Sequence, residues 1–280
     1  MTIALSIKVN DGVVLATDSA ATIFAKIEGD RVGVVNVYNN ADKLFNLLKD
    51  FPIGVITWGS GSIGKASIST LVKDFRKSLA SRLKKADEYQ LGQIATDFAK
   101  YIYEDNYLPA FKDWPDKPNL GFMICGYSAR QGNYQDFAEE WKIDIVNGEL
   151  KGPSLIRGEE QVGMTWSGEP EAITRLYLGF SPQLSQVLID YGLEPEKVTQ
   201  EIVPKLIEAL TIPFILAPLP IQDAIDIAEF FVQTTITFSK FRPGAPSVGG
   251  PIDIAAITKH EGFKWVKRKY YFTRDINPVS

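Results

Sequence analysis

The chain has 280 residues and a formal net charge of −4, with a single Cys, Cys125, and a single His, His260. A disulfide needs two thiols and a structural zinc site needs about four Cys or His ligands, so neither can form within this chain. A hydrolase that uses imidazole as its base would depend on His260 alone, so another base is expected. The composition implies no metal and no organic cofactor.

Charge and hydropathy predict a cytoplasmic protein. The acidic net charge argues against electrostatic binding of nucleic acid. No apolar run reaches the roughly 18 residues of a membrane span, and the N-terminus lacks the basic and apolar regions of a secretory signal. We therefore expect neither a nucleic-acid partner nor a membrane partner.

The first predicted element is a β-hairpin. Residues 2–9 alternate between apolar and polar side chains, and the turn signal Asn10-Asp11-Gly12 leads to a return strand at 13–18. A two-residue loop and a three-residue loop give different strand pairings. We expect the three-residue loop, because it pairs apolar residues with one another and places Ala4 opposite Asp18.

Periodicity and turn residues predict the remaining elements in chain order. Further strands are expected at 43–47, 53–58, 120–126, 136–146, 161–166, 252–258 and 263–271. Helices are expected at 63–83, 89–103, 170–178, 195–209 and 221–238. Residues 28–41 are expected to form a short hairpin or loop, and 104–118 a loop. Strand runs separated by groups of helices favour packed antiparallel sheets and helices over an alternating βαβ sheet.

The glycine-rich segment at 59–66, Gly-Ser-Gly-Ser-Ile-Gly-Lys-Ala, follows a predicted strand and precedes a predicted helix. It matches G-x-G-x-x-G, but Ala66 stands where a P-loop has the hydroxyl that binds magnesium. Nucleotide binding is therefore the weaker interpretation. The favoured one is that backbone N–H groups at a glycine-rich helix start stabilise an oxyanion.

Thr2 is a candidate nucleophile that needs no histidine. Removal of Met1 would leave threonine with a free α-amine. The hydroxyl would attack, and the amine, with a reference pKa of about 7.7, would accept its proton. The alternative is that Thr2 is simply the second residue of an ordinary chain.

Residues 2–22, from Thr2-Ile-Ala-Leu-Ser to Asp18-Ser-Ala-Ala-Thr, resemble the N-terminal block of proteasome β-type subunits, a family of N-terminal-nucleophile hydrolases. Similar blocks follow in the same order at 41–47, 53–61, 165–168, 223–228 and 247–258. Their order and spacing carry the resemblance, which suggests a divergent bacterial proteasome-like member.

The resemblance implies a fold and a domain plan. The fold would be α+β, a four-layer α/β/β/α sandwich. Residues 1–280 would form one domain, with insertions near 28–40, 104–118 and 180–218.

The resemblance also implies roles for named residues. Thr2 would be the nucleophile, Lys43 would lower the effective pKa of its hydroxyl, and Asp18 would hold Lys43 charged and oriented. The Gly59 N–H would stabilise the oxyanion, and Ser167 and Ser247 would hydrogen-bond around the α-amine or Asp18. The alternatives are a surface ion pair for Asp18 and Lys43, and a helix cap and a turn for the serines.

Two positions depart from the family pattern. Ala20 replaces a basic residue, and Ser239 stands where the family has an acidic residue at the end of its fourth helix. Ser247 therefore lacks an evident acidic partner.

The function expected from these residues is a threonine-type peptidase. It would cleave peptides or unfolded protein through an acyl-enzyme on Thr2, as a ring-like homo-oligomer. Two alternatives are an amidase or acylase acting on a small-molecule amide, and a non-catalytic assembly protein.

Overall fold

The computed structural model describes residues 2–28, 31–84, 88–244 and 246–269. Met1, part of the expected insertion at 28–40 and the last residues of the strand expected at 263–271 lie outside the described residues.

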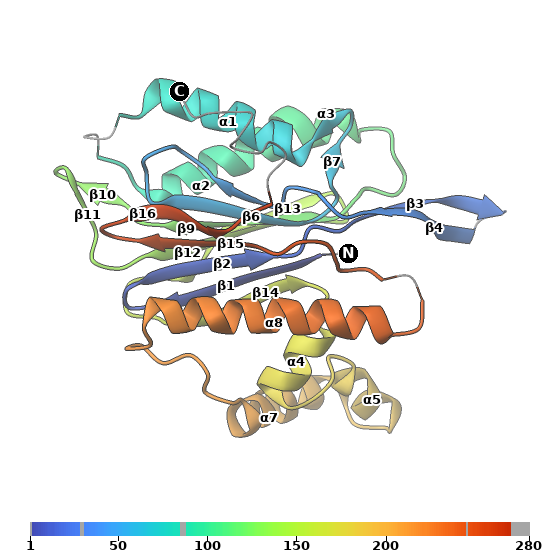
Figure 1. Ribbon diagram of the computed structural model, residues 1–280. Coiled ribbons are helices and arrows are strands. Elements are labelled where there is room, and N and C mark those ends of the chain that lie inside the picture. The colour runs from blue at the N-terminus through green and yellow to red at the C-terminus, as the bar shows by residue number, and fades with distance from the viewer. Residues whose placement is uncertain (1, 29–30, 85–87, 245, 270–280) are drawn as a thin grey trace.

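Two five-stranded antiparallel sheets form the centre of the fold (Figure 1). The first sheet has the order β14 (Gly163–Gly168), β1 (Ile3–Val9), β2 (Gly12–Thr17), β15 (Asp253–Thr258) and β16 (Gly262–Lys267). The second has the order β13 (Glu149–Arg157), β12 (Glu139–Val146), β9 (Leu120–Gly126), β6 (Ile53–Gly59) and β5 (Leu44–Asn46). The two-stranded pairs are β3 (Ala21–Glu28) with β4 (Arg31–Tyr38), β7 (Ser62–Ile63) with β8 (Ala66–Ser67), and β10 (Ala129–Arg130) with β11 (Asn133–Tyr134).

Helices lie on both outer sides of the central sheets (Figure 1). The second sheet is covered by α1 (Ile68–Arg82), α2 (Leu91–Lys100), the π-helical segment η1 (Tyr101–Tyr107) and α3 (Leu108–Ala110). The first sheet is covered by α8 (Ile221–Phe241). Below α8 in that view lie α4 (Glu171–Leu178), α5 (Leu184–Asp190), α6 (Pro195–Lys197), η2 (Val198–Ile202) and α7 (Val203–Leu210).

The expected four-layer α/β/β/α sandwich is wrong as a description of this chain. The described residues form five antiparallel sheets, the β3–β4 hairpin extends beyond both central sheets, and α4 to α7 add a further group of helices (Figure 1). The physical reason is that segments expected as insertions pair their backbone groups in strands and helices of their own. The expected loop at 104–118 likewise begins in helical turns, because Tyr107 is buried and donates its hydroxyl to the Pro118 carbonyl at 2.8 Å.

The register expected for the first hairpin is also wrong. Ala4 lies opposite Thr17, and Val9 lies opposite Gly12, so the loop has two residues, Asn10 and Asp11. Gly12 belongs to β2, where a Cβ atom would lie 2.3 Å from the carbonyl oxygen of Ile257 in β15. The glycine therefore permits close strand approach instead of forming the turn.

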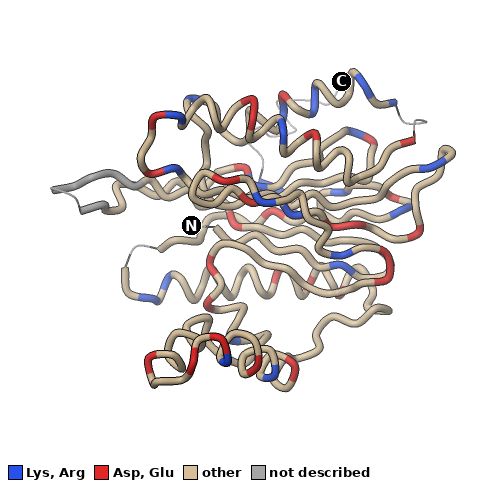
Figure 2. Tube along the Cα trace, turned by 180° about the vertical axis from the view of Figure 1, so that it is seen from behind, with Lys and Arg blue, Asp and Glu red and all other residues tan. Residues whose placement is uncertain are grey.

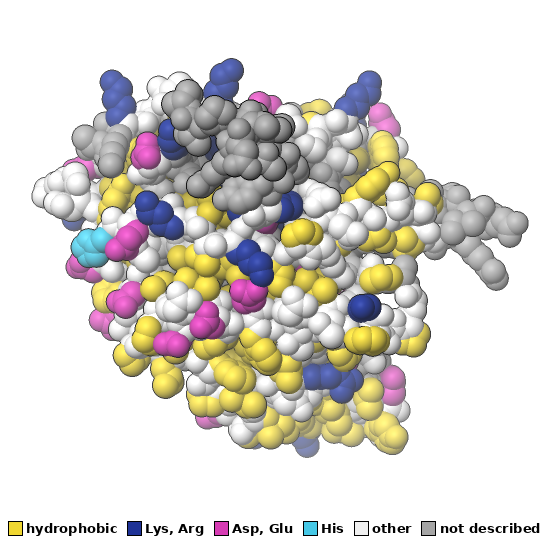
Figure 3. Space-filling view, viewed as in Figure 1, with side chains coloured by type: hydrophobic (Ala, Val, Ile, Leu, Met, Phe, Trp, Pro, Cys, Tyr) yellow, Lys and Arg dark blue, Asp and Glu magenta, His cyan; other side chains and the backbone are white. Residues whose placement is uncertain are grey.

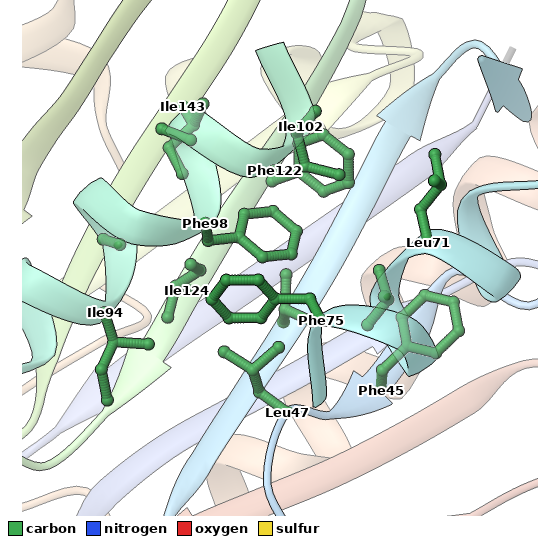
Figure 4. Close-up of a cluster of buried hydrophobic side chains, with 14 of the residues drawn as sticks. Phe45, Leu47, Leu71, Phe75, Ile94, Phe98, Ile102, Phe122, Ile124 and Ile143 are labelled. Atoms are coloured by element: carbon green, nitrogen blue, oxygen red, sulfur yellow. The ribbon is translucent and has the colours of Figure 1, made fainter. Parts of the chain in front are cut away.

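The core between the helices and the second sheet is mainly aliphatic, with a series of packed aromatic rings in it (Figure 4). Phe75 of α1 and Phe98 of α2 have ring centroids 5.1 Å apart, and Phe98 lies 5.0 Å from Phe122 of β9, both with edge-to-face geometry. A second core joins the two sheets through Leu15 of β2 and Met123 of β9. These cores fix the strand ends at which the candidate site lies.

Candidate functional site

Asp18 and Lys43 form a buried ion pair between the two sheets' strand ends. Asp18 directly follows β2, and Lys43 directly precedes β5. Lys43 Nζ donates to Asp18 Oδ1 at 2.7 Å. The backbone N–H of Ile3 donates to the same oxygen at 3.1 Å, and those of Ala20 and Gly249 donate to Oδ2 at 3.0 Å each. The Asp18 side chain is wholly buried, so a surface ion pair is excluded.

Burial sets the electrostatics of this pair. Removal from water lowers the pKa of Lys43 below its ordinary value, the Asp18 carboxylate opposes that change, and the nearby Lys269 ammonium adds to it. Lys269 is itself buried, forms an ion pair with Asp253 of β15 and lies 3.8 Å from Asp42. Two buried lysines therefore lie in one cluster with three carboxylates.

Thr2 is buried at the start of β1, next to this cluster. The Ile3 N–H that follows it bonds to Asp18, and the Thr2 carbonyl accepts the N–H of Glu169 at 2.7 Å. Gly168 lies opposite Ile3 with φ of +99°, and a Cβ atom there would lie 1.8 Å from the Thr2 carbonyl oxygen. Only glycine permits β14 to approach the Thr2 backbone this closely.

The two serines expected at the site differ in their surroundings. Ser167 is half buried in β14 opposite Ala4, and it is not the residue that precedes α4, which is Pro170. Ser247 is buried after α8 and donates its hydroxyl to Glu169 Oε2 at 3.2 Å.

Gly59 ends β6 near Lys43. The Thr57 N–H, two residues before Gly59, donates to the Lys43 carbonyl at 2.9 Å. Gly59 has φ of +86°, and a Cβ atom there would lie 2.4 Å from the Asn119 carbonyl oxygen. Both the dihedral and the neighbouring backbone therefore require glycine.

The sequence suggested that the glycine-rich segment leads directly into a helix, but it does not. The β7–β8 hairpin lies between Gly59 and α1. The side chain of Ser67 then caps α1 by accepting the Thr70 N–H at 3.1 Å. This geometry differs from that of a phosphate-binding loop, in which free amides at the helix start surround the ligand.

Sequence reasoning missed several charged residues of this region, namely Glu169, Arg242, Asp253 and Lys269. Glu169 follows the Ser-Gly motif directly and carries a buried carboxylate, which forms an ion pair with Arg242 at 3.2 Å. Asp253 had a usable signal, because it is a lone acid within the apolar run 252–257. Lys269 lies beyond the last strand and carries no local signal.

The lone histidine and cysteine belong to other parts of the fold. His260 is exposed in the turn between β15 and β16 (cyan in Figure 3), and Cys125 is buried in β9, where burial raises the pKa of its thiol. Within the described ranges, no group of three or more His, Cys, Asp or Glu is placed to hold a metal ion.

Acidic and basic residues are interspersed over the elements seen from behind (Figure 2). Among the helices of the described residues, none combines the length and the apolar character needed to cross a membrane.

No family model and no curated protein sequence matches the chain. Among solved structures, Anbu (ancestral beta-subunit) from Yersinia bercovieri is 12% identical, with 96% of this chain and 88% of that chain covered, at a TM-score of 0.46. An Anbu (Gly-1) mutant from Hyphomicrobium sp. strain MC1 is 12% identical, with 99% and 91% covered, at a TM-score of 0.51. The second match shows a proteasome-like fold relationship.

These comparisons overturn the assignment to the proteasome β-type subunit family made from the sequence. Family models do not match the chain, and the structure matched at a TM-score of 0.51 is an Anbu mutant that is only 12% identical to it. The collinear blocks reflect a shared order of strands and helices, which distant chains of one fold can have in common.

Proposed function

We propose that the chain is a threonine-dependent amide hydrolase that cleaves peptide bonds, with Thr2 as nucleophile after removal of Met1. The observation that carries the proposal is the buried Lys43–Asp18 pair, whose carboxylate also accepts the N–H of Ile3, the residue after Thr2. A fold alone does not assign an activity, so the proposal rests on this site.

The chemistry needs only the N-terminal residue and its surroundings. The neutral α-amine of Thr2 takes the proton of its own hydroxyl as Oγ1 attacks the carbonyl carbon of the substrate. The tetrahedral intermediate collapses, the protonated amine gives its proton to the leaving nitrogen, and an ester remains on Thr2. Water, deprotonated by the same amine, then hydrolyses the ester and releases the carboxylic acid.

The surrounding residues would each perform one task. The Lys43 ammonium favours the alkoxide form of the hydroxyl, and Asp18 holds that ammonium in place. The N–H of Gly59 would donate to the oxyanion, and Ser167 and Ser247 would orient the amine.

Self-association is expected from the outer surface of α8. Phe230, Phe238 and Phe241 are 50%, 37% and 77% exposed, and hydrophobic side chains lie on the surface formed by α8 and the helices below it (Figure 3). Exposed aromatic residues of this kind are typical of a protein–protein interface. Light scattering after gel filtration should give a mass above that of one chain, and Phe241→Asp should lower it.

The proposed function is tested by intact mass and covalent labelling. The purified chain should lack Met1, and a peptide electrophile that reacts with both the amine and the hydroxyl of an N-terminal threonine should add one equivalent to Thr2. Thr2→Ala is the matched control, because alanine still permits removal of Met1 but removes the hydroxyl. Retention of Met1, or equal labelling of Thr2→Ala, would overturn the proposal.

A further inference from the structure

We propose that Glu169 is the positioning residue of the Thr2 centre: its carboxylate holds Ser247 against the start of β1 and supplies the negative charge beside the Thr2 α-amine. The inference rests on the proposed function for its catalytic meaning, but the contacts are independent of that function.

Glu169 is tied to Thr2 through its backbone and to Ser247 through its side chain. Its N–H donates to the Thr2 carbonyl at 2.7 Å, and its Oε2 accepts the Ser247 hydroxyl at 3.2 Å. The residue is 4% exposed. The Glu169 backbone is therefore fixed relative to the backbone of Thr2, and its buried carboxylate is held by Ser247 and Arg242.

The short loop 247–249 connects the two carboxylates of the site. At one end Ser247 bonds to Glu169, and at the other the Gly249 N–H donates to Asp18 at 3.0 Å. Glu169 and Asp18 in turn hold the backbone of Thr2 and Ile3. The loop and the start of β1 are therefore positioned by the same pair of acids.

Ser239, near the end of α8, supports this arrangement without carrying a charge. Its hydroxyl accepts the Ser247 N–H at 3.1 Å and lies 3.3 Å from the Ser247 hydroxyl. The negative charge that Ser247 meets therefore comes from Glu169 after β14, while α8 contributes Ser239 and, just beyond its end, the Arg242 partner of Glu169.

The charged residues of this region come from several elements. The cations are Lys43 before β5, Arg242 after α8 and Lys269 after β16; the anions are Asp18 after β2, Asp42 before β5, Glu169 after β14 and Asp253 of β15. A nearby anion raises the pKa of an amine and a nearby cation lowers it. Because Glu169 is an anion and Arg242 is a cation, substitutions of the two should have opposite effects on the amine pKa.

The test measures the pKa of the Thr2 amine from the pH dependence of its acetylation by dilute acetic anhydride, read by mass spectrometry. It uses the full chain beginning at Thr2, obtained by cleavage of a fusion if cells retain Met1. Glu169→Gln should lower the amine pKa by about half a unit or more, and Arg242→Gln should raise it. Asp97→Asn is the control, since Asp97 of α2 accepts from Arg82 and Gln93 in the helices that cover the second sheet and should leave the amine unchanged.

A further variant separates charge from general damage to the fold. Adding Ser239→Asp to Glu169→Gln returns a carboxylate within reach of Ser247 and should restore most of the shift. An unchanged amine pKa in Glu169→Gln, or shifts in the same direction for Glu169→Gln and Arg242→Gln, would overturn the inference. If Thr2 resists the peptide electrophile but the opposite shifts are found, the proposed function fails while the inference about Glu169 stands.

Discussion

The two partners of the buried ion pair should differ in their contribution to stability. Asp18→Ala leaves the Lys43 ammonium buried without a counter-charge and leaves the N–H groups of Ile3, Ala20 and Gly249 without their acceptor. Removing one partner of a buried pair costs about 3–5 kcal/mol. Lys43→Met leaves the carboxylate with its three N–H donors, so its cost should be that of one charged hydrogen bond, about 1.5–3 kcal/mol.

Urea unfolding at neutral pH, followed by circular dichroism and extrapolated linearly, measures both free energies of unfolding. The pH dependence supplies a second readout. Because the folded-state pKa of Lys43 is lowered, the unfolded chain binds more protons between that value and 10.5, so stability rises with pH in this window. Lys43→Met should flatten that rise. Equal costs for the two variants, or a larger cost for Lys43→Met, would show that the backbone donors do not hold the carboxylate.

Three further outcomes are expected. Arg157→Met should cost about 3–5 kcal/mol in urea unfolding, because Arg157 is bonded at 2.7 Å to the fully buried Glu140; adding Glu140→Gln should recover much of that loss. Gly59→Ala should destabilise the chain by about 1–3 kcal/mol, because Gly59 has a positive φ, and it should slow labelling of Thr2. Gly61→Ala is the control: Gly61 has open space for a Cβ atom, so neither stability nor labelling should change. The Cys125 thiol, buried and with a raised pKa, should react with a disulfide reagent only after unfolding, as followed by absorbance.

Much of the secondary structure could be predicted because burial and periodicity are local properties. The strand at 120–126 has the predicted bounds, and the helix predicted at 221–238 is observed three residues longer. The helix predicted at 195–209 instead divides into α6, η2 and α7, and α5 was not predicted. The first hairpin's register was wrong because the constraint on Gly12 comes from β15, some 240 residues away in the chain.

The site was predictable only in part, because its contacts depend on how distant strands pack together. Asp18 directly follows β2 and Lys43 directly precedes β5, and the structure joins their side chains in an ion pair. Their roles in catalysis stay predictions. Ser247 lies two residues before Gly249, whose N–H donates to Asp18. Its acidic partner is Glu169, which directly follows β14, and not a residue at the end of α8. Nothing in the local sequence indicates which strand end supplies a carboxylate, because that depends on how β14 packs beside β1.

The placement of these acids follows from the sheets themselves. At the end of a strand, backbone N–H groups no longer meet a neighbouring strand, and a carboxylate can accept them. Asp18 takes three such donors, and that satisfies its charge where water is excluded. An acid held by the backbone in this way stays in position whether or not Lys43 is charged. The lowered pKa of Lys43 therefore does not disturb the position of Asp18.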